Sequence, residues 1–492
     1  MRKNRIVACL PFALALVAAS SQAATIVVTS RDPAGVGFND PTPVTPVGGN
    51  PGLTLGEQRM NVYKYVAHIW EQNLDSPVTI TVSAGWEALT CTSTTAVLGS
   101  ASPWNIWYDF PNGKPQTWYP QALANKLAGT NLSFDPANPD ANYEDTVDIH
   151  TQFNINLGNT GCLDGTPFYL GLDGNAGSKV NFVETLLHEL GHGLGFTVLT
   201  VNGPTGQRLN ATGTAYVTNG GLPSIWEGFM YDSTIGKTWL NMTSPERKAS
   251  AINPLHLGWQ SAAMTVAAGQ VLGSVPSMKI ATPAPTGSGF YDYNTASFGG
   301  VVTIGQAFGT LATVPADPVN GAGCLAFDAA TTNAVRGKVA IIDRGVCAFA
   351  VKAKNAQDAG AFGVIIANNA AGAAPGLGGS DPTITIPTVS VSQADGTTLK
   401  QVVADAPKYG TRAKPGSVGS TFMLDASRRA GAEGGRPLLY TPNPYVSGSS
   451  VSHWDVSAFP NLLMEPNINS DLTTTLVPPL DLTKSLLIDL GW

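Results

Sequence analysis

The chain has 492 residues and a formal net charge of −7, with 43% apolar and only 12% charged residues, 54 Gly and 35 Pro. This balance excludes a coiled coil and an intrinsically disordered chain, and it argues against nucleic-acid binding, which needs clustered Lys and Arg. At roughly 100 to 200 residues per domain, the length predicts two to four domains.

The N-terminal segment has the features of a secretory signal peptide at residues 1–23. Arg2, Lys3 and Arg5 precede an apolar run, and residues 21–23 (Ser-Gln-Ala) supply small side chains at the cleavage positions. No later stretch of about 18 apolar residues follows. We therefore expect a secreted protein, extracellular or periplasmic, with no transmembrane anchor in the mature chain.

Four cysteines lie beyond the signal peptide, and an even number in an oxidising compartment favours disulfides. A change in composition near residues 265–300 separates the first two cysteines from the last two. Of the three connectivities we therefore favour two pairs, Cys91–Cys162 and Cys324–Cys347.

The region from residue 24 to 265 mixes predicted strands and helices. Alternating or β-branched runs predict strands at residues 24–30, 78–82 and 146–157. Apolar spacing predicts three helices, which run from the Thr54/Glu57 capping box to Leu74, over residues 178–194, and onward from an N-cap at Ser244 with Pro245 in the first turn.

Residues 266–420 are richer in small side chains. A strand at 338–343, a helix at 348–359 closed by Gly360, and a strand at 363–367 predict a compact βαβ core. Beyond residue 420 the apolar, aromatic composition of the first region returns and leads to a short helix ending at Trp492.

The strongest chemical motif is His188-Glu189-x-x-His192, which lies on the helix predicted at residues 178–194. Two His at i and i+4 lie on one helical face, so both imidazoles can reach one Zn²⁺ while the Glu lies close enough to act on water. Gly195 can end this helix with a positive φ and turn the chain beneath the metal. A catalytic zinc then needs a third protein ligand.

Together with Gly195, the motif resembles the HExxHxxGxxH signature of the metzincin metalloproteases. The last position of that signature holds Val198 in this chain. Residues 452–466 (SHWDVSAFPNLLMEP) resemble the displaced third ligand and Met-turn of the leishmanolysin-like metzincins, in which an insertion separates the Gly from the third His. The resemblance implies that His453 is the third zinc ligand and that Met464 is the Met-turn residue under the site.

Two carboxylates stay open as the third ligand, because Glu or Asp completes other HExxH zinc sites: Glu227 and Asp232. The remaining histidines, His68, His150 and His256, lack the context of a ligand. We expect one catalytic Zn²⁺ as cofactor. Whether the protein also binds Ca²⁺ stays open, because no motif in the sequence supports such a site.

Residues 338–369, followed by residues 386–392, resemble a protease-associated (PA) domain, a noncatalytic module inserted in or attached to secreted peptidases. The two resemblances imply an α+β fold. A metzincin-like catalytic domain, with a mixed twisted sheet and the active-site helix, would be split into residues 24–265 and 421–492. An α/β PA domain would be inserted at residues 266–420.

We therefore expect a secreted, monomeric zinc endopeptidase that acts on proteins or peptides. It would hydrolyse peptide bonds with a zinc-activated water and Glu189 as the general base. The alternative is a secreted binding or adhesion protein in which the PA domain carries the function and the zinc is structural or residual.

Overall fold

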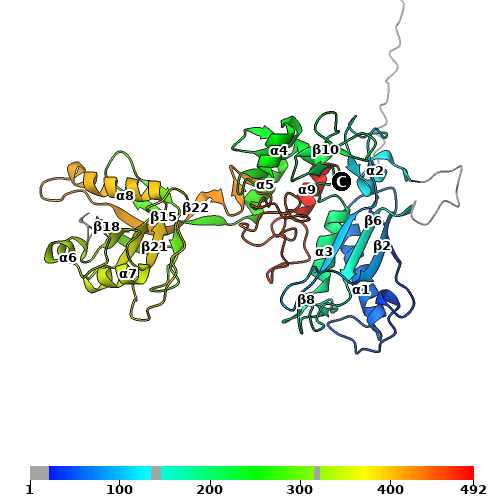
Figure 1. Ribbon diagram of the computed structural model, residues 1–492, viewed down its shortest axis with the longest axis horizontal. Helices are drawn as coiled ribbons and strands as arrows, with labels where there is room; N and C mark the ends of the chain where they lie inside the picture. The colour runs from blue at the N-terminus through cyan, green and yellow to red at the C-terminus, as the bar shows by residue number, and fades with distance from the viewer. Residues whose placement is uncertain (1–21, 134–145, 315–321) are drawn as a thin grey trace, which may run out of the picture. The chain divides into compact units, whose positions relative to one another are not determined.

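The computed structural model describes residues 22–133, 146–314 and 322–492 (Figure 1). The chain divides into two compact units, unit 1 (Met1–Leu272 and Gly431–Trp492) and unit 2 (Gly273–Ala430). The junctions predicted from the sequence, 265/266 and 420/421, fall inside helix α5 (Ala262–Val271) and strand β22 (Gly419–Arg429). Residues 1–21 of the expected signal peptide lie outside the described residues.

Unit 1 contains a four-stranded sheet in the order β1-β2-β6-β3. The first three strands are parallel, and β3 runs antiparallel to β6, with Ala101 opposite Thr151. In the described part of the chain, β3 is therefore an outer strand. The strands are β1 (Ile26–Ser30), β2 (Ile80–Glu87), β3 (Gly99–Pro103) and β6 (Ile149–Asn154).

The helices of unit 1 are α1 (Leu55–Glu71), α2 (Gln121–Ala128), α3 (Phe182–Gly193), α4 (Ser244–Ser250), α5 (Ala262–Val271) and α9 (Thr483–Leu490). The predicted capping box of Thr54 and Glu57 opens α1, and the helix ends three residues before the predicted Leu74. Helix α4 begins one residue earlier than predicted, because Thr243, and not Ser244, is its N-cap and forms a capping box with Glu246.

Short strands complete unit 1. They are β4 (Ile106–Trp107) with β5 (Tyr119–Pro120), β7 (Phe168–Tyr169) with β8 (Val180–Asn181), β9 (Val201–Asn202) with β10 (Gln207–Leu209) and β11 (Tyr216–Val217), β12 (Met230–Asp232) with β13 (Lys237–Thr238) and β14 (Leu257–Trp259), and β23 (Ala432–Glu433) with β24 (Arg436–Pro437).

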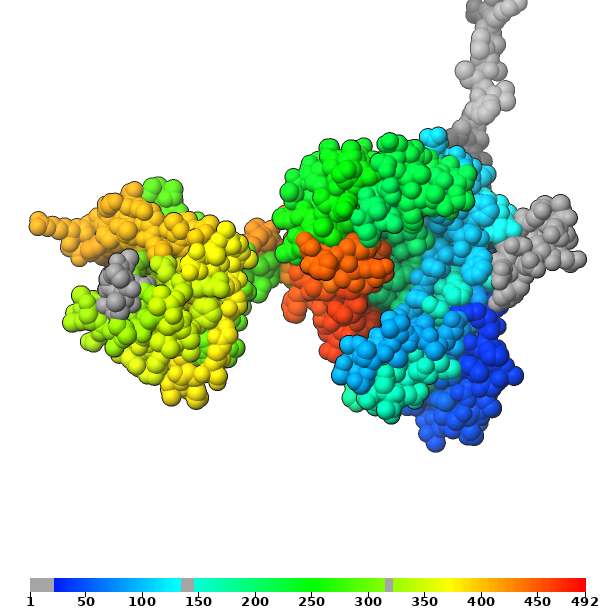
Figure 2. Space-filling view, viewed as in Figure 1, coloured from blue at the N-terminus to red at the C-terminus, as the bar shows by residue number. Residues whose placement is uncertain are grey.

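One hydrophobic core unites the two sequence segments of unit 1. Helix α3 packs against α1, β3 and β6, and Phe182 on α3 meets Phe153 on β6 edge to face at 4.9 Å. The C-terminal segment contributes buried Trp454, Met464 and Leu487 to the same core. Its orange and red surface accordingly lies against the blue to green surface of the N-terminal part of unit 1 in Figure 2.

Unit 2 contains an eight-stranded sheet in the order β16-β15-β22-β18-β19-β20-β21-β17. Its strands are β15 (Ser274–Ala281), β16 (Gly289–Tyr291), β17 (Asn294–Thr295), β18 (Ala307–Thr313), β19 (Val339–Asp343), β20 (Gly363–Ala367), β21 (Thr388–Val391) and β22 (Gly419–Arg429), and its helices are α6 (Ala329–Val335), α7 (Phe349–Asp358) and α8 (Gln393–Asp405). Strands β18 to β21 are parallel. The structure confirms the predicted βαβ core as β19-α7-β20.

Both faces of this parallel sheet are covered. Ile341 on β19 packs in one core with Leu399 of α8, whereas its neighbour Ile342 packs in the other core with Ala353 of α7. A strand covered on both faces reads as a continuous apolar run, as β19 does. The first and last strands of unit 2 pair with each other, since Ser274 lies opposite Arg429.

No helix among residues 22–133, 146–314 and 322–492 has the length and apolar character needed to cross a bilayer.

Candidate metal centre

Helix α3 positions the first two histidines. Asn181 caps the helix by accepting the Val183 N–H at 3.0 Å, so the helix begins later than the residue 178 that the sequence predicts. His188 and His192 lie one turn apart and are both buried. Their rings meet edge to face with centroids 4.8 Å apart.

A glycine turn ends α3 directly after His192. Gly195 has a φ of +120°, as predicted, and its N–H donates to the His192 carbonyl at 3.0 Å. The Phe196 N–H donates to the Gly191 carbonyl at 2.9 Å, which completes a Schellman motif. This turn brings the Phe196 carbonyl to 2.6 Å from His192 Nδ1.

The third histidine comes from the C-terminal segment of unit 1. Val198, which occupies the last position of the metzincin signature, donates its N–H to Ser452 Oγ at 3.1 Å. The segment after α3 therefore lies beside His453. The His453 ring is buried, and its Nδ1 lies 2.8 Å from the Ser449 carbonyl.

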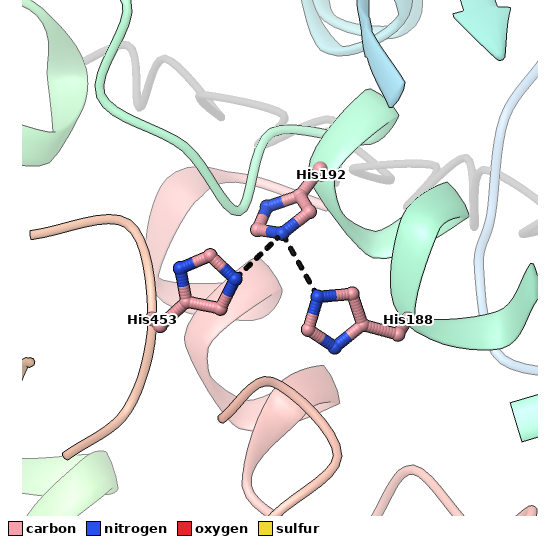
Figure 3. A group of neighbouring side chains, drawn as sticks. All are labelled: His188, His192 and His453. Carbon is pink, nitrogen blue, oxygen red and sulfur yellow. Dashed lines mark hydrogen bonds between the residues drawn. The ribbon is translucent and has the colours of Figure 1, made fainter. Parts of the chain in front are cut away.

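The three Nε2 atoms converge on one point (Figure 3). His192 Nε2 lies 3.1 Å from His188 Nε2 and 3.2 Å from His453 Nε2. Each Nδ1 faces a backbone carbonyl, and His188 Nδ1 lies 2.7 Å from the Leu463 carbonyl. Because a carbonyl only accepts, each Nδ1 carries the proton and each Nε2 presents a bare lone pair.

Three lone pairs at this separation cannot satisfy one another, whereas a cation between them satisfies all three. Neutral imidazole nitrogen is a preferred ligand of Zn²⁺, and three protein ligands with an open fourth position are typical of catalytic zinc. The donor set therefore fits a zinc ion. Within the described residues, this is the one group of three or more His, Cys, Asp or Glu side chains close enough to hold a metal.

Burial keeps these imidazoles neutral. It lowers the pKa of His188 to about 4, and burial with the nearby His188 lowers the pKa of His453 to about 3. Burial and the two neighbouring imidazoles hold the pKa of His192 well below its usual value. At neutral pH all three rings are in the form that binds a metal.

Glu189 faces the same cavity as the three histidines, a space of about 1070 Å³. The Ala101 N–H on β3 donates to its carboxyl group, and burial raises its pKa to about 8. Gly99, Ser100 and Ala101 also line the cavity, so the outer strand of the sheet forms one wall. Strand β3 is not among the strands predicted from the sequence.

Met464 lies directly under α3. A Cβ on Gly191 would come within 2.8 Å of Met464 Sδ, so the thioether packs directly against the helix backbone at the residue before His192. The Met464 carbonyl accepts the Trp454 N–H at 2.8 Å, which ties it to the residue that follows His453.

The two alternative third ligands lie outside the histidine group. Glu227 is buried and forms an ion pair with Arg208 at 2.7 Å. Asp232 accepts the Thr234 N–H at 2.9 Å in the turn that follows it. Both carboxylates therefore have structural partners of their own.

One buried acid near the site was missed from the sequence. Asp481 accepts the Leu463 N–H through Oδ2 at 2.8 Å and the Thr483 N–H through Oδ1 at 2.7 Å. Leu463 in turn accepts the Nδ1 proton of His188, so Asp481 fixes that ligand through a single residue. The available signal was an Asp two residues before the C-terminal helix, where a carboxylate satisfies free N–H groups.

Both favoured disulfides are present. Cys91–Cys162 lies in unit 1 and Cys324–Cys347 lies in unit 2.

Comparison with known proteins identifies part of unit 2. The PA domain family matches residues 307–399. Leucine aminopeptidase 2 of Arthroderma otae is 45% identical over 83 residues, which are 17% of this chain and 16% of that protein. The minor extracellular protease Vpr of Bacillus subtilis is 34% identical over 97 residues, which are 20% of this chain and 10% of that protein. The chain thus spans about a sixth or less of the length of these curated relatives.

Solved structures give weaker likenesses. BSAP, a zinc aminopeptidase from Bacillus subtilis, shares 20% identity at a TM-score of 0.20 and covers 33% of this chain and 36% of its own. The subtilisin-like protease Apa1 from Pseudoalteromonas shares 18% identity at a TM-score of 0.21 and covers 31% and 34%. The chain's own helices and strands make it a mixed α/β protein, and the family match assigns a PA domain to residues 307–399, within unit 2.

Proposed function

We propose that the protein is a zinc-dependent endopeptidase of the leishmanolysin-like metzincin type, with unit 1 as the catalytic part and the PA domain as its insertion. One observation carries the proposal. The bare Nε2 atoms of His188, His192 and His453 converge in a cavity that Glu189 also lines. The Gly195 turn after the helix and Met464 beneath it add support.

His188, His192 and His453 would hold one zinc ion and leave one position open. Zinc in that place would supply a Lewis acid that makes water more acidic and polarises the carbonyl group of the scissile bond. The carbonyl partners of the three Nδ1 atoms fix the tautomer and orientation of each ring.

Glu189 carries the proton in this scheme. Its carboxylate oxygen takes a proton from the attacking water and later gives it to the amine that leaves. The Ala101 N–H holds the carboxyl group against β3, on the wall of the cavity. The residue therefore moves a proton between two groups that meet in the same space.

The position of β3 supports cleavage within a chain. An outer strand offers unpaired N–H and C=O groups, to which an extended peptide can add as a further strand. A peptide bound in this way can continue in both directions past Glu189. The names of the relatives favour a second candidate, an aminopeptidase, which would need a free substrate N-terminus.

We also propose that the enzyme acts outside the cytoplasm. The two disulfides support this, because such bonds persist in oxidising compartments. One relative is named an extracellular protease. The basic and apolar residues at the N-terminus of the sequence, which have the features of a secretory signal peptide, also support this location.

The test is hydrolysis of internally quenched peptides by the purified full chain loaded with zinc, compared with the Glu189→Gln variant. We expect the variant to keep its zinc and to lose about 10³-fold in kcat/KM, since it has lost its general base. Cleavage of N-acetylated peptides supports the endopeptidase, whereas cleavage restricted to free N-termini supports the aminopeptidase. Full activity of the variant contradicts the role of Glu189 as general base, whereas the absence of hydrolysis by the zinc-loaded wild type points to the binding or adhesion protein.

A further inference from the structure

Glu184 is a second carboxylate in the cavity, and the proposed chemistry does not use it. It lies four residues before His188 on α3, and residues at this spacing share one helical face about 5 to 6 Å apart. The series Glu184, His188 and His192 therefore follows one face of the helix along the cavity wall. An extended peptide covers this spacing in about two residues.

Charge is scarce along this wall. Apart from the three histidines, Lys179, Glu184 and Glu189 are the ionisable side chains among the described residues that line the cavity. Lys179 is exposed, and the ion pairs among the described residues include neither Lys179 nor Glu184. With Glu189 engaged in proton transfer, Glu184 is the carboxylate that remains to recognise a substrate.

The surroundings of Glu184 satisfy the hydrogen-bonding capacity of its carboxyl group only in part. It is half-buried, and its partner is the side chain of Asn181, the N-cap of α3. Burial raises its pKa to about 7. A half-buried carboxylate without a cationic partner pays a desolvation cost that a bound ammonium or guanidinium group offsets.

We propose that Glu184 is a specificity-determining residue that binds a cationic group of the substrate peptide, about two residues from the cleaved bond. This rests on the proposed peptidase function. The cation is a Lys or Arg side chain or the α-ammonium group of a short peptide, which share the chemistry that a carboxylate recognises. Glu184 lies in the first turn of α3, so its competing role is to stabilise the helix N-terminus.

The experiment compares Glu184→Gln with the wild type on matched internally quenched peptides. The first set of peptides is N-acetylated and carries Lys, norleucine or Glu two residues from the cleaved bond, on either side of it. The second set is one neutral peptide, made with a free N-terminus and with an acetylated N-terminus. We expect the variant to lose about tenfold in kcat/KM on the cationic peptides and to stay within about twofold on the neutral ones. Loss on the Lys series identifies a side-chain site, and loss on the free N-terminus identifies an α-ammonium site.

Glu57→Gln is the matched control. Glu57 is also the first-turn acid of a helix, α1, but it does not line the cavity. We expect this variant to keep the selectivity of the wild type. If Glu184→Gln lowers kcat/KM equally on all peptides, or on none, Glu184 serves the helix alone and the proposal is wrong. If the Glu184→Gln variant does not fold, the same comparison with the wild type is made with Glu184→Asp, which keeps the charge but shortens the side chain.

Binding separates this inference from the proposed function. Affinities of the Lys and norleucine peptides, and of the neutral peptide with a free or acetylated N-terminus, are measured by calorimetry on Glu189→Gln, with and without Glu184→Gln. Preference for Lys that depends on Glu184 supports the site even if the wild type proves catalytically inert, which would overturn the peptidase alone. Equal affinities in both proteins overturn the site while peptide hydrolysis by the wild type keeps the function intact.

Discussion

Units 1 and 2 are built from contacts of different range along the chain. The core of unit 2 is β19-α7-β20, in which consecutive elements pack together and the two strands pair in parallel. The candidate site of unit 1 instead joins α3 to His453, and a whole folded unit lies between them in sequence. Local sequence can encode the first arrangement, whereas the second exists only after distant segments have packed.

The largest effect is expected from a substitution that disrupts the long-range assembly of α3 with His453. His453→Ala removes one of three Nε2 donors, so we expect zinc affinity to fall by more than about 100-fold and hydrolysis to cease. Metal content by mass spectrometry measures this directly. His256→Ala is the control, because His256 lies outside the histidine group and pairs with Glu433. Full zinc content in His453→Ala would return the third-ligand role to Glu227 or Asp232.

Each unit has a disulfide of its own, which allows their stabilities to be compared. Replacing Cys91 and Cys162 by Ala opens a sequence separation of 71 residues, and replacing Cys324 and Cys347 opens one of 23. The chain-entropy model predicts losses of about 4 and about 3 kcal/mol for the two units. Hydrogen exchange followed separately in each unit measures both losses. Zinc content that falls with the second pair would show that the two units are not independent.

A smaller effect is expected at Asp481. The carboxylate accepts two N–H groups through two oxygens, whereas Asn has a single acceptor oxygen, so Asp481→Asn loosens Leu463 and with it His188. We expect about tenfold weaker zinc binding in a competition titration with a chelator. Asp489→Asn is the control, since Asp489 accepts bonds from Trp259 and Ser261 away from the histidines. Equal effects of the two variants would assign Asp481 a purely structural role.

The sequence predicts those features whose determinants are close together. The βαβ core of unit 2 follows from apolar runs and one glycine-closed helix, and the positions of His188 and His192 follow from helical spacing alone. Helix α3 starts at Phe182 and not at 178, because Val180 and Asn181 pair with β7 before the helix begins.

The remaining features depend on partners that sequence spacing does not reveal. Strand β3 consists of Gly, Ser, Ala and Pro, which are weak strand formers, and it is a strand because β6 supplies its hydrogen bonds. The carbonyl partners of the three Nδ1 atoms come from a helix turn and two loops. His453 likewise lies far from α3 in sequence, so residue spacing does not indicate that it joins His188 and His192, and only the family resemblance implies it.

The pairing of Ser274 with Arg429 has a consequence for how unit 1 folds. Because the first and last strands of the insertion are neighbours in one ladder, a folded unit 2 presents its two ends close together. To the rest of the chain it is then equivalent to a short loop. If unit 2 were unfolded, the same connection would be a flexible tether of well over a hundred residues, and closing it would cost about 3 kcal/mol more in chain entropy. An order of events in which unit 2 folds first would therefore make it easier for His453 to reach helix α3.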